Sequence, residues 1–302
     1  MPDILRTVSD VIRRHYDGLT PTERRLADSL LENYPVSGLG SITATAENAG
    51  VSTATVARAV QKLGFKGYPE FQARLHQELE ATISNPIAKH DQWQDLWAAR
   101  APDTHILNRF AEAVTDNLRD TLAEIDIAAF DGASALLRDL DRHIYFVGGR
   151  ITGSLAEYFF THMQVIRPRT TLISNNSSSW PQHVINMNAG DVLVIFDIRR
   201  YEQEMATLAE AASAAGVVIV LFTDLWASPV AHSARHIFKM RIEAPSAWDS
   251  SVVTLFVVEA LIEAVQSAEW QATRDRIHSL ENLFERSRLF RRGGKNDRQN
   301  HG

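Results

Sequence analysis

The sequence predicts an N-terminal all-α bundle followed by an α/β/α domain with a parallel sheet. Helix caps and apolar residues at helical spacing recur through the first part of the chain, and wholly apolar runs alternate with helical segments from residue 143 onward. Such runs are typical of parallel strands that helices cover on both faces. The 302 residues suit two domains of roughly 100–200 residues each. We place the helical domain at residues 1–82, a linker and connecting helix at 83–125, the α/β domain at 126–270, and a basic helical tail with a disordered end at 271–302.

The composition is that of a globular protein, with 45% hydrophobic and 23% charged residues. The chain has no cysteine, which excludes disulfides, zinc fingers and thiol catalysis. No apolar run approaches the ~20 residues that a membrane span needs, and the first residues lack the layout of a signal peptide. We therefore expect a cytoplasmic protein with no membrane partner.

Three helices are predicted before residue 49. Apolar residues at helical spacing predict an amphipathic helix over residues 4–16. Thr20, Pro21 and Glu23 form a capping box with proline in the first turn, which predicts the start of a second helix. Ser41 is placed to cap the third.

Residues 46–58 have the spacing of a helix-turn-helix. Ala46 allows two helices to cross closely, Gly50 supplies a left-handed turn residue, and Ser52 caps the next helix. Val56 then returns an apolar side chain to the crossing. The same spacing places polar residues that suit a DNA major groove on the outer face: Thr53, Thr55, Arg58 and Lys62. A helical hairpin with no role in DNA binding is the alternative.

The formal net charge of the chain is −6, but DNA binding depends on local charge because phosphate contacts act over about a Debye length. Residues 51–76 carry four basic residues and one acidic residue. The acidic surplus therefore lies elsewhere in the chain, which suits a regulator that binds defined sites.

Three segments together resemble the N-terminal domain of the RpiR family of bacterial transcriptional regulators: residues 19–23, 46–58 and 63–71. The family pattern is close to A-x-x-x-G-V-S-x-A-T-V-x-R-F-x-x-x-L-G-F-x-G-[YF]-x-[ED]-[FL], and Ala59 stands where an aromatic residue is usual. The resemblance implies double-stranded operator DNA as the partner. It also implies which residues meet that DNA: Ser52, Thr53, Thr55 and Arg58, with Lys62 and Lys66 on phosphates.

A break separates the two domains. Pro86 disfavours helix in the residue before it. Helical spacing returns over residues 106–125, where we expect a connecting helix that can pack against a second subunit.

The second domain alternates strands and helices. Strands are predicted at residues 143–147, 170–173, 191–196, 217–222 and 236–240, and helices at 154–163, 202–215 and 248–268. Ligands of such sheets collect at the carboxyl ends of the strands.

Two of these strand ends carry residues suited to an anion. Small residues, hydroxyls and an arginine precede a helix N-terminus after the first strand: Gly148, Gly149, Arg150, Thr152 and Ser154. An acid, two arginines and a phenol follow the third strand: Asp197, Arg199, Arg200 and Tyr201. Arginine binds phosphate or carboxylate through two parallel hydrogen bonds. The arginines either hold a ligand in this way, or pair with Asp197, Glu202 or Glu204 and join subunits.

The order of elements and the turn at residues 224–231 resemble the sugar isomerase (SIS) domain. This resemblance implies the fold of that domain and a ligand between these loops. Two departures concern the ligand. Arg150 replaces a glycine of the usual G-x-G-x-S loop, and residues 197–202 replace the hydroxyl-rich S-x-S-G-x-T loop by an acid and two arginines. An amine-bearing or carboxylate-bearing metabolite therefore suits these loops at least as well as a phosphosugar.

These patterns favour a DNA-binding transcriptional regulator whose SIS-like domain senses a small anionic metabolite. We expect a homodimer or homotetramer on an imperfect palindrome. We expect no catalysis, metal or cofactor, because no acid–base pair, metal motif or nucleophile elbow is evident. One alternative is a sugar-phosphate isomerase-type enzyme with an appended helical domain, and another is a structural oligomeriser.

The tail from residue 274 combines apolar residues that can dock on a neighbour with a basic run. A solvated tail is our main interpretation, and auxiliary DNA contact is the lesser one.

Overall fold

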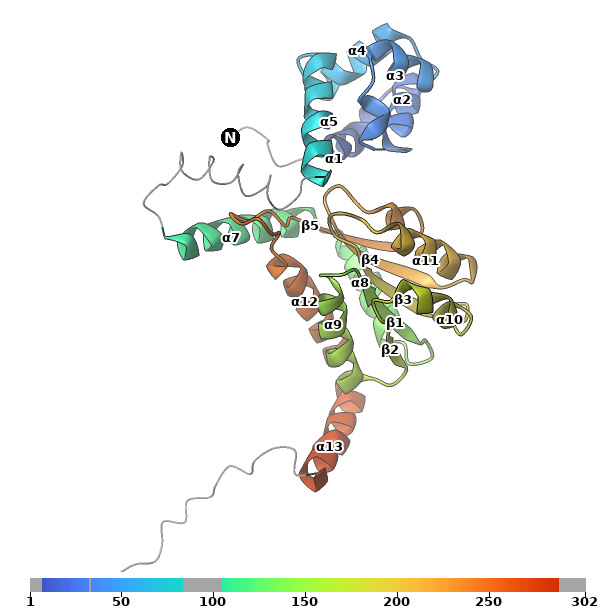
Figure 1. Ribbon diagram of the computed structural model, residues 1–302, viewed down its shortest axis with the longest axis vertical. Coiled ribbons are helices and arrows are strands. Elements are labelled where there is room, and N and C mark those ends of the chain that lie inside the picture. Colours follow the sequence, from blue (N-terminus) through green and yellow to red (C-terminus); the bar gives the residue numbers. More distant parts are fainter. Residues whose placement is uncertain (1–6, 33, 84–104, 288–302) are drawn as a thin grey trace, which may run out of the picture.

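The computed structural model describes residues 7–32, 34–83 and 105–287, which form a helical domain, a protruding helix and an α/β domain (Figure 1). Residues 84–104, which belong to the predicted linker and connecting helix at 83–125, and the chain beyond residue 287 lie outside the described residues. Within the described ranges, no helix is both long and apolar enough to cross a membrane.

Five α-helices build the N-terminal domain: α1 (Val8–His15), α2 (Pro21–Glu32), α3 (Ile42–Asn48), α4 (Thr53–Lys62) and α5 (Tyr68–Ile83). The first helix begins later than predicted because Thr7 caps it, its hydroxyl accepting the backbone N–H of Asp10. The capping box of α2 forms as predicted, with the Thr20 N–H donating to Glu23 at 2.8 Å. The apolar stripes of these helices meet in one core that includes Ile12, Leu26 and Val56.

A buried carboxyl ties the last of these helices to the first. Glu78 of α5 accepts the Val8 N–H at 2.9 Å and the hydroxyl of Tyr34. Arg74, one turn earlier, lies 3.3 Å from the same carboxyl. Burial raises the pKa of Glu78 to about 8, and the hydrogen bond from the Val8 N–H opposes the rise. The carboxyl therefore fixes how α5 and α1 pack.

The α/β domain is built on five parallel strands, β1 (Ile144–Gly148), β2 (Thr170–Leu172), β3 (Val192–Phe196), β4 (Val218–Asp224) and β5 (His236–Met240). Their order in the sheet is β2-β1-β3-β4-β5. After β1 the chain forms β2 on one side of β1 and then crosses to the other side to form β3. The crevice at such a reversal, outside the carboxyl ends of the strands, is the usual ligand site of this architecture.

Helices cover both faces of the sheet (Figure 1). One face packs on α8 (Ile127–Arg138), α9 (Gly153–Ile166) and α12 (Val252–Ala268), and the other on α10 (Trp180–Val184) and α11 (Gln203–Ala214). The inner strands β1 and β3 are consequently buried along their whole length, which is why they are apolar in sequence, whereas the edge strands β2 and β5 are partly exposed and contain polar residues.

Two further helices project from the α/β domain. The connecting helix α7 (Ile106–Glu124) packs on α12 and β5 through its C-terminal part, and α13 (Trp270–Ser287) continues from α12 (Figure 1). Helix α12 begins at Val252 instead of residue 248, because residues 241–251 form an irregular segment after β5. The tail helix begins before the predicted residue 274, and its basic end falls outside the described residues.

Candidate functional site

Helices α3 and α4 form a helix-turn-helix with the predicted local geometry. Gly50 has φ +61°, the left-handed conformation that glycine adopts without a Cβ clash. The Val51 N–H donates to the Ala46 carbonyl at 2.9 Å, which closes the end of α3. The Ser52 hydroxyl accepts the Thr55 N–H at 3.2 Å and starts α4. Val56 is completely buried at the crossing.

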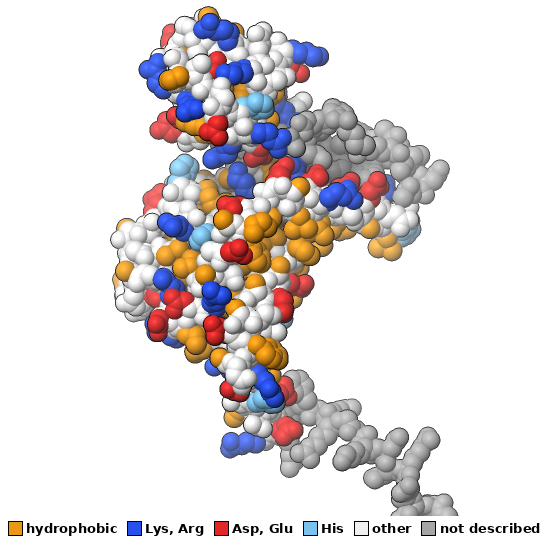
Figure 2. Space-filling model, turned by 180° about the vertical axis from the view of Figure 1, so that it is seen from behind, with side chains coloured by type: hydrophobic (Ala, Val, Ile, Leu, Met, Phe, Trp, Pro, Cys, Tyr) orange, Lys and Arg blue, Asp and Glu red, His pale blue; other side chains and the backbone are white. Residues whose placement is uncertain are grey.

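The outer face of α4 carries most of the predicted DNA-binding residues. Ser52, Thr53 and Arg58 are exposed, and so is Lys66 in the following turn. The side chain of Lys62 is 41% exposed and lies 3.0 Å from Glu23 of α2, so this lysine also joins two helices. Figure 2 shows Lys and Arg side chains spread over the surface of this domain.

Thr55 does not lie on that face, and our placement of it there is wrong. Only 8% of the residue is exposed, and its hydroxyl lies 2.9 Å from that of Ser52. Helices α2, α3 and α5 pack around α4, and they cover a wider part of it than the spacing of apolar residues suggests. Thr55 therefore supports the N-terminal cap of α4 from within the domain.

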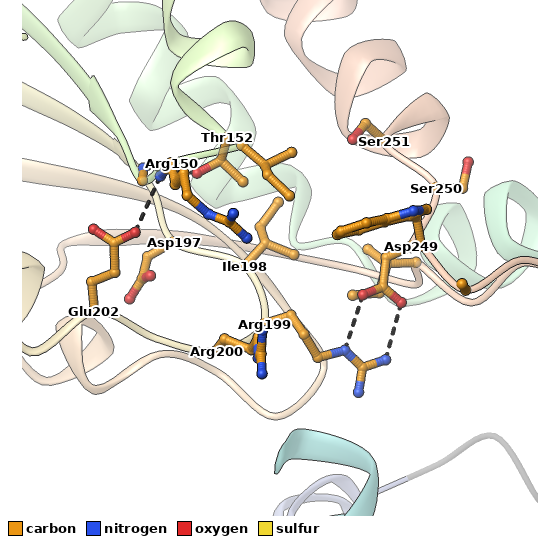
Figure 3. Close-up of a pocket in the computed structure, with 15 residues that line it drawn as sticks. Arg150, Thr152, Asp197, Ile198, Arg199, Arg200, Glu202, Asp249, Ser250 and Ser251 are labelled. Carbon is orange, nitrogen blue, oxygen red and sulfur yellow. Dashed lines mark hydrogen bonds and ion pairs between the residues drawn. The ribbon is translucent and has the colours of Figure 1, made fainter. Parts of the chain in front are cut away.

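A cavity of about 710 Å³ opens where the loops after β1 and β3 meet, at the reversal in strand order (Figure 3). Six of the predicted ligand residues line it: Gly149, Arg150, Thr152, Asp197, Arg199 and Arg200. Three do not line it: Gly148, Ser154 and Tyr201. The irregular segment 241–251 supplies the opposite wall, including Trp248 and Asp249, which the sequence did not reveal as pocket residues.

Thr152 ties the two loops together. Its hydroxyl accepts the Gly149 N–H at 2.8 Å and donates to the Phe196 carbonyl of β3 at 2.7 Å. Gly148 permits this approach, because a Cβ there would lie 2.5 Å from the Thr152 carbonyl oxygen. Gly148 and Thr152 thus shape the loop. The Ser154 hydroxyl donates to the Ile151 carbonyl and does not line the cavity.

Asp197 lies at the base of the cavity and is only 3% exposed. Ser228 donates its hydroxyl to the carboxyl of Asp197. Burial raises the pKa of Asp197 to about 6, and the bond from Ser228 opposes the rise. A carboxyl that titrates near neutrality suits a general base, but this one is held by Ser228 beneath the surface of the cavity.

Arg199 makes ion pairs, with partners other than those we considered. Its Nε lies 3.1 Å from one carboxylate oxygen of Asp249, and its Nη2 lies 3.1 Å from the other. Nη2 also lies 3.6 Å from Glu243. The guanidinium also stacks on the ring of Trp226 at 4.3 Å. Asp197, Glu202 and Glu204, which are near Arg199 in sequence, are not among these ion-pair partners. Asp249 and Glu243 both come from the segment after β5.

The backbone beneath Arg199 is held by a buried acid. Asp224, which is fully buried at the end of β4, accepts the Arg199 N–H at 2.7 Å and the hydroxyl of Tyr201. Burial raises the pKa of Asp224 to about 6. Arg199 and Arg200 both have positive φ, at +50° and +53°, a conformation that costs energy for residues with a Cβ. Tyr201 therefore anchors this strained loop through its bond to Asp224.

Two arginines remain to meet an anion. Arg150 and Arg200 are exposed and line the cavity, and neither side chain has an ion pair with a described residue. The backbone N–H of Arg150 donates to Glu202 at 3.1 Å, which fixes its loop (Figure 3). The N-termini of α9 and α12 also face the cavity, at Thr152 and Ser251, and helix N-termini favour anions. Across the described ranges, no three acidic or histidine side chains cluster in a way that could hold a metal ion.

Comparison with known families matches both domains. The model of the helix-turn-helix domain of the rpiR family matches residues 7–82, and the model of the SIS domain matches residues 136–264. The chain belongs to the RpiR family. It is therefore a DNA-binding transcriptional regulator with a SIS domain.

The relatives of this RpiR protein agree with its assignment. It is 24% identical over 237 residues to the HTH-type transcriptional regulator HexR of Pseudomonas aeruginosa, which covers 76% of this chain and 77% of HexR. It is 35% identical over 82 residues to the uncharacterised regulator YfhH of Escherichia coli, which covers 27% of this chain and 29% of YfhH.

Solved structures share the fold of this RpiR protein. The sugar isomerase domain of an RpiR transcription factor from Sphaerobacter thermophilus matches with a TM-score of 0.55 at 21% identity, covering 59% of this chain and 98% of that domain. The Vibrio vulnificus NanR protein, solved as a complex with ManNAc-6P, matches with a TM-score of 0.53 at 18% identity. That match covers 92% of this chain and 98% of NanR.

Proposed function

We propose that this regulator senses a small anionic metabolite in the cavity between β1 and β3 and that binding alters its affinity for an operator. The observation that carries this proposal is the pair Arg150 and Arg200, two guanidinium groups without an ion-pair partner among the described residues, at a cavity that two helix N-termini also face. Guanidinium groups and helix N-termini both favour phosphate or carboxylate. NanR, whose structure holds ManNAc-6P, supports a phosphorylated ligand as one candidate.

The operator would be read by the exposed residues of the helix-turn-helix. Arg58 and Thr53 lie where a recognition helix meets base edges, while Ser52, Lys62 and Lys66 lie where they can contact phosphates. Thr55 is left out because it is buried. A protein that acts on bacterial DNA in this way would work in the cytoplasm.

A homodimer or homotetramer is the assembly we propose. Figure 2 shows a broad apolar patch where α7 and α12 meet. The exposed apolar residues of these two helices include Leu122 of α7 and Val252 and Phe256 of α12. Leu107, in the first turn of α7, is 71% exposed. Apolar patches of this kind mark protein–protein contacts, and two copies would present two DNA-binding domains to a palindrome.

Enzymatic activity is not part of the proposal. Asp197 is the one carboxyl at the cavity with a pKa raised toward neutrality among the described residues, and Ser228 holds it below the surface. Coupled assays with common aldose and ketose phosphates should stay at the buffer baseline. Turnover that Asp197→Ala abolishes would favour the isomerase-type alternative.

The function is tested in two steps. Operator sites are first selected from random-sequence DNA with the full chain, and a selected palindromic site supports the regulator. Thermal melting is then measured with sugar phosphates, carboxylates and inorganic phosphate. A ligand at 100 times its Kd should add about 2.7 kcal/mol of stability. Replacing Arg150 and Arg200 by glutamine should remove this shift, and Arg138→Gln, at an exposed site on α8 outside the cavity, should keep it.

A further inference from the structure

A carboxylate of the protein itself, that of Asp249, lies in the proposed anion site. Asp249 binds Arg199 in the bidentate geometry that guanidinium groups use for phosphate and carboxylate ligands (Figure 3). Both groups line the cavity. The Asp249 side chain is 21% exposed and that of Arg199 is 11% exposed, so the pair is accessible from the cavity. An incoming anion therefore meets this arginine already occupied.

Two carboxylates surround that single guanidinium. Glu243 lies 3.6 Å from the same Nη2 atom that Asp249 contacts. The local charge of these three groups is thus negative, and it repels a further anion as long as both carboxylates stay in place. Moving Asp249 away leaves one arginine and one carboxylate, which removes most of the repulsion and frees a bidentate edge.

The carboxylates belong to an irregular segment whose first part is buried and whose Trp248–Asp249 part is more exposed. Residues 241–251 contain no helix or strand. The Ser250 N–H donates to the Ile242 carbonyl at 2.8 Å and closes the base of the segment, while Asp249 pairs with Arg199 near its exposed end. Trp248, beside Asp249, is 55% exposed. The exposed Trp248–Asp249 part is therefore the part of the segment that displacement of Asp249 from Arg199 would affect first.

The same segment is joined to the connecting helix. The Asn117 side chain of α7 donates to the Glu243 carbonyl at 2.5 Å. The Arg241 N–H donates to the Thr121 hydroxyl at 3.1 Å, and its guanidinium donates to Glu124 at 3.0 Å. Asn117 and Thr121 are buried in this contact. A shift of the segment at Glu243 would therefore change its hydrogen bond to α7, the first described element after the DNA-binding domain.

We propose that Asp249 is an internal competitor for the effector: the ligand's anionic group displaces it from Arg199, and residues 243–250 then move and release their contact with α7. This inference rests on the proposed anion site and adds how that site is regulated. It assigns Arg150 and Arg200 to the first capture of the ligand and Arg199 to the exchange of one anion for another. The free energy of displacing Asp249 sets the threshold concentration of effector.

The test uses inorganic phosphate as the probe and the full chain. Phosphate affinity is measured by calorimetry for the wild type, Asp249→Asn, Arg199→Gln and the double variant. Asp249→Asn should bind phosphate about tenfold more tightly than the wild type, since asparagine is neutral and competes poorly for a guanidinium. Asp275→Asn, which removes the same charge from α13, should stay within about twofold of the wild type. The double variant should show no such increase in phosphate affinity over Arg199→Gln.

Hydrogen–deuterium exchange supplies the second readout. Saturating phosphate should raise amide exchange in residues 243–250 and in the Asn117–Glu124 part of α7, and Asp249→Asn should show this increase without phosphate. If Arg199→Gln fails to fold, Arg199→Lys replaces it, because lysine keeps the charge and loses the bidentate contact. Equal affinity of Asp249→Asn and wild type would overturn the proposal, and so would a gain that persists without Arg199.

The outcomes separate this proposal from the proposed function. If wild-type binding depends on Arg150 and Arg200 but Asp249→Asn adds nothing, the competitor is refuted and the anion site stands. If no variant binds phosphate, the anion site and the competitor are both refuted, while selection of operator DNA still decides the regulator itself.

Discussion

Arg58→Ala should weaken specific DNA binding without unfolding the helical domain. Arg58 lies on the exposed face of α4 and has no ion pair with a described residue, so its loss should change the free energy of unfolding by no more than about 0.5 kcal/mol. A direct base contact is worth ~1–3 kcal/mol. At 1.4 kcal/mol per factor of ten, operator affinity should fall by about 5- to 150-fold.

The assay is a gel shift at fixed salt with the selected operator and a scrambled duplex, alongside thermal melting of the free protein. Arg138→Ala, on α8 of the other domain, removes the same charge and should leave binding unchanged. Lys62→Ala provides a contrast, because a phosphate contact should weaken binding to both duplexes and reduce the salt slope by about 1. Undiminished affinity and selectivity of Arg58→Ala would refute the placement of α4 in the major groove.

Three further predictions concern the cavity and its supports. Gly148→Ala should destabilise the α/β domain by about 1–3 kcal/mol in denaturant unfolding, because its Cβ would lie 2.5 Å from a backbone oxygen, whereas Gly18→Ala, with nothing within 4 Å, should cost far less. Thr152→Val should cost about 1–3 kcal/mol, since the Gly149 N–H and the Phe196 carbonyl each lose a partner, and Thr152→Ser should restore most of it; equal stability of the valine and serine variants would contradict this role. Asp197 has its pKa raised to about 6 in the folded state, so the folded protein holds that proton more tightly than the unfolded chain. Asp197 therefore adds roughly 2–3 kcal/mol to the free energy of unfolding below about pH 4, and this contribution is lost as the pH rises through about 6. The free energy of unfolding of Asp197→Asn should consequently fall less between pH 4 and 7 than that of the wild type, and parallel pH profiles would count against a buried, protonated Asp197.

Features that depend on neighbours in sequence could be predicted from the sequence. The caps at Thr20 and Ser52, the left-handed Gly50 and the five strands each follow from residues a few positions apart. Local hydrogen bonds and backbone preferences decide such elements, and both are written in short segments. The RpiR and SIS assignments rested on motifs of the same local kind, and the family comparisons confirm them.

Features that depend on packing were decided only by the tertiary structure. Helical spacing placed Thr55 on the outer face, but its burial depends on how α2, α3 and α5 surround α4. Sequence proximity suggested Glu202 or Glu204 as partners of Arg199, whereas the fold brings Asp249 from 50 positions away. The order β2-β1-β3-β4-β5, which opens the cavity between two loops, also cannot be derived from the strands taken singly. A side chain's partners are set by which surfaces meet in three dimensions, and the local patterns that form helices and strands carry little information about that meeting.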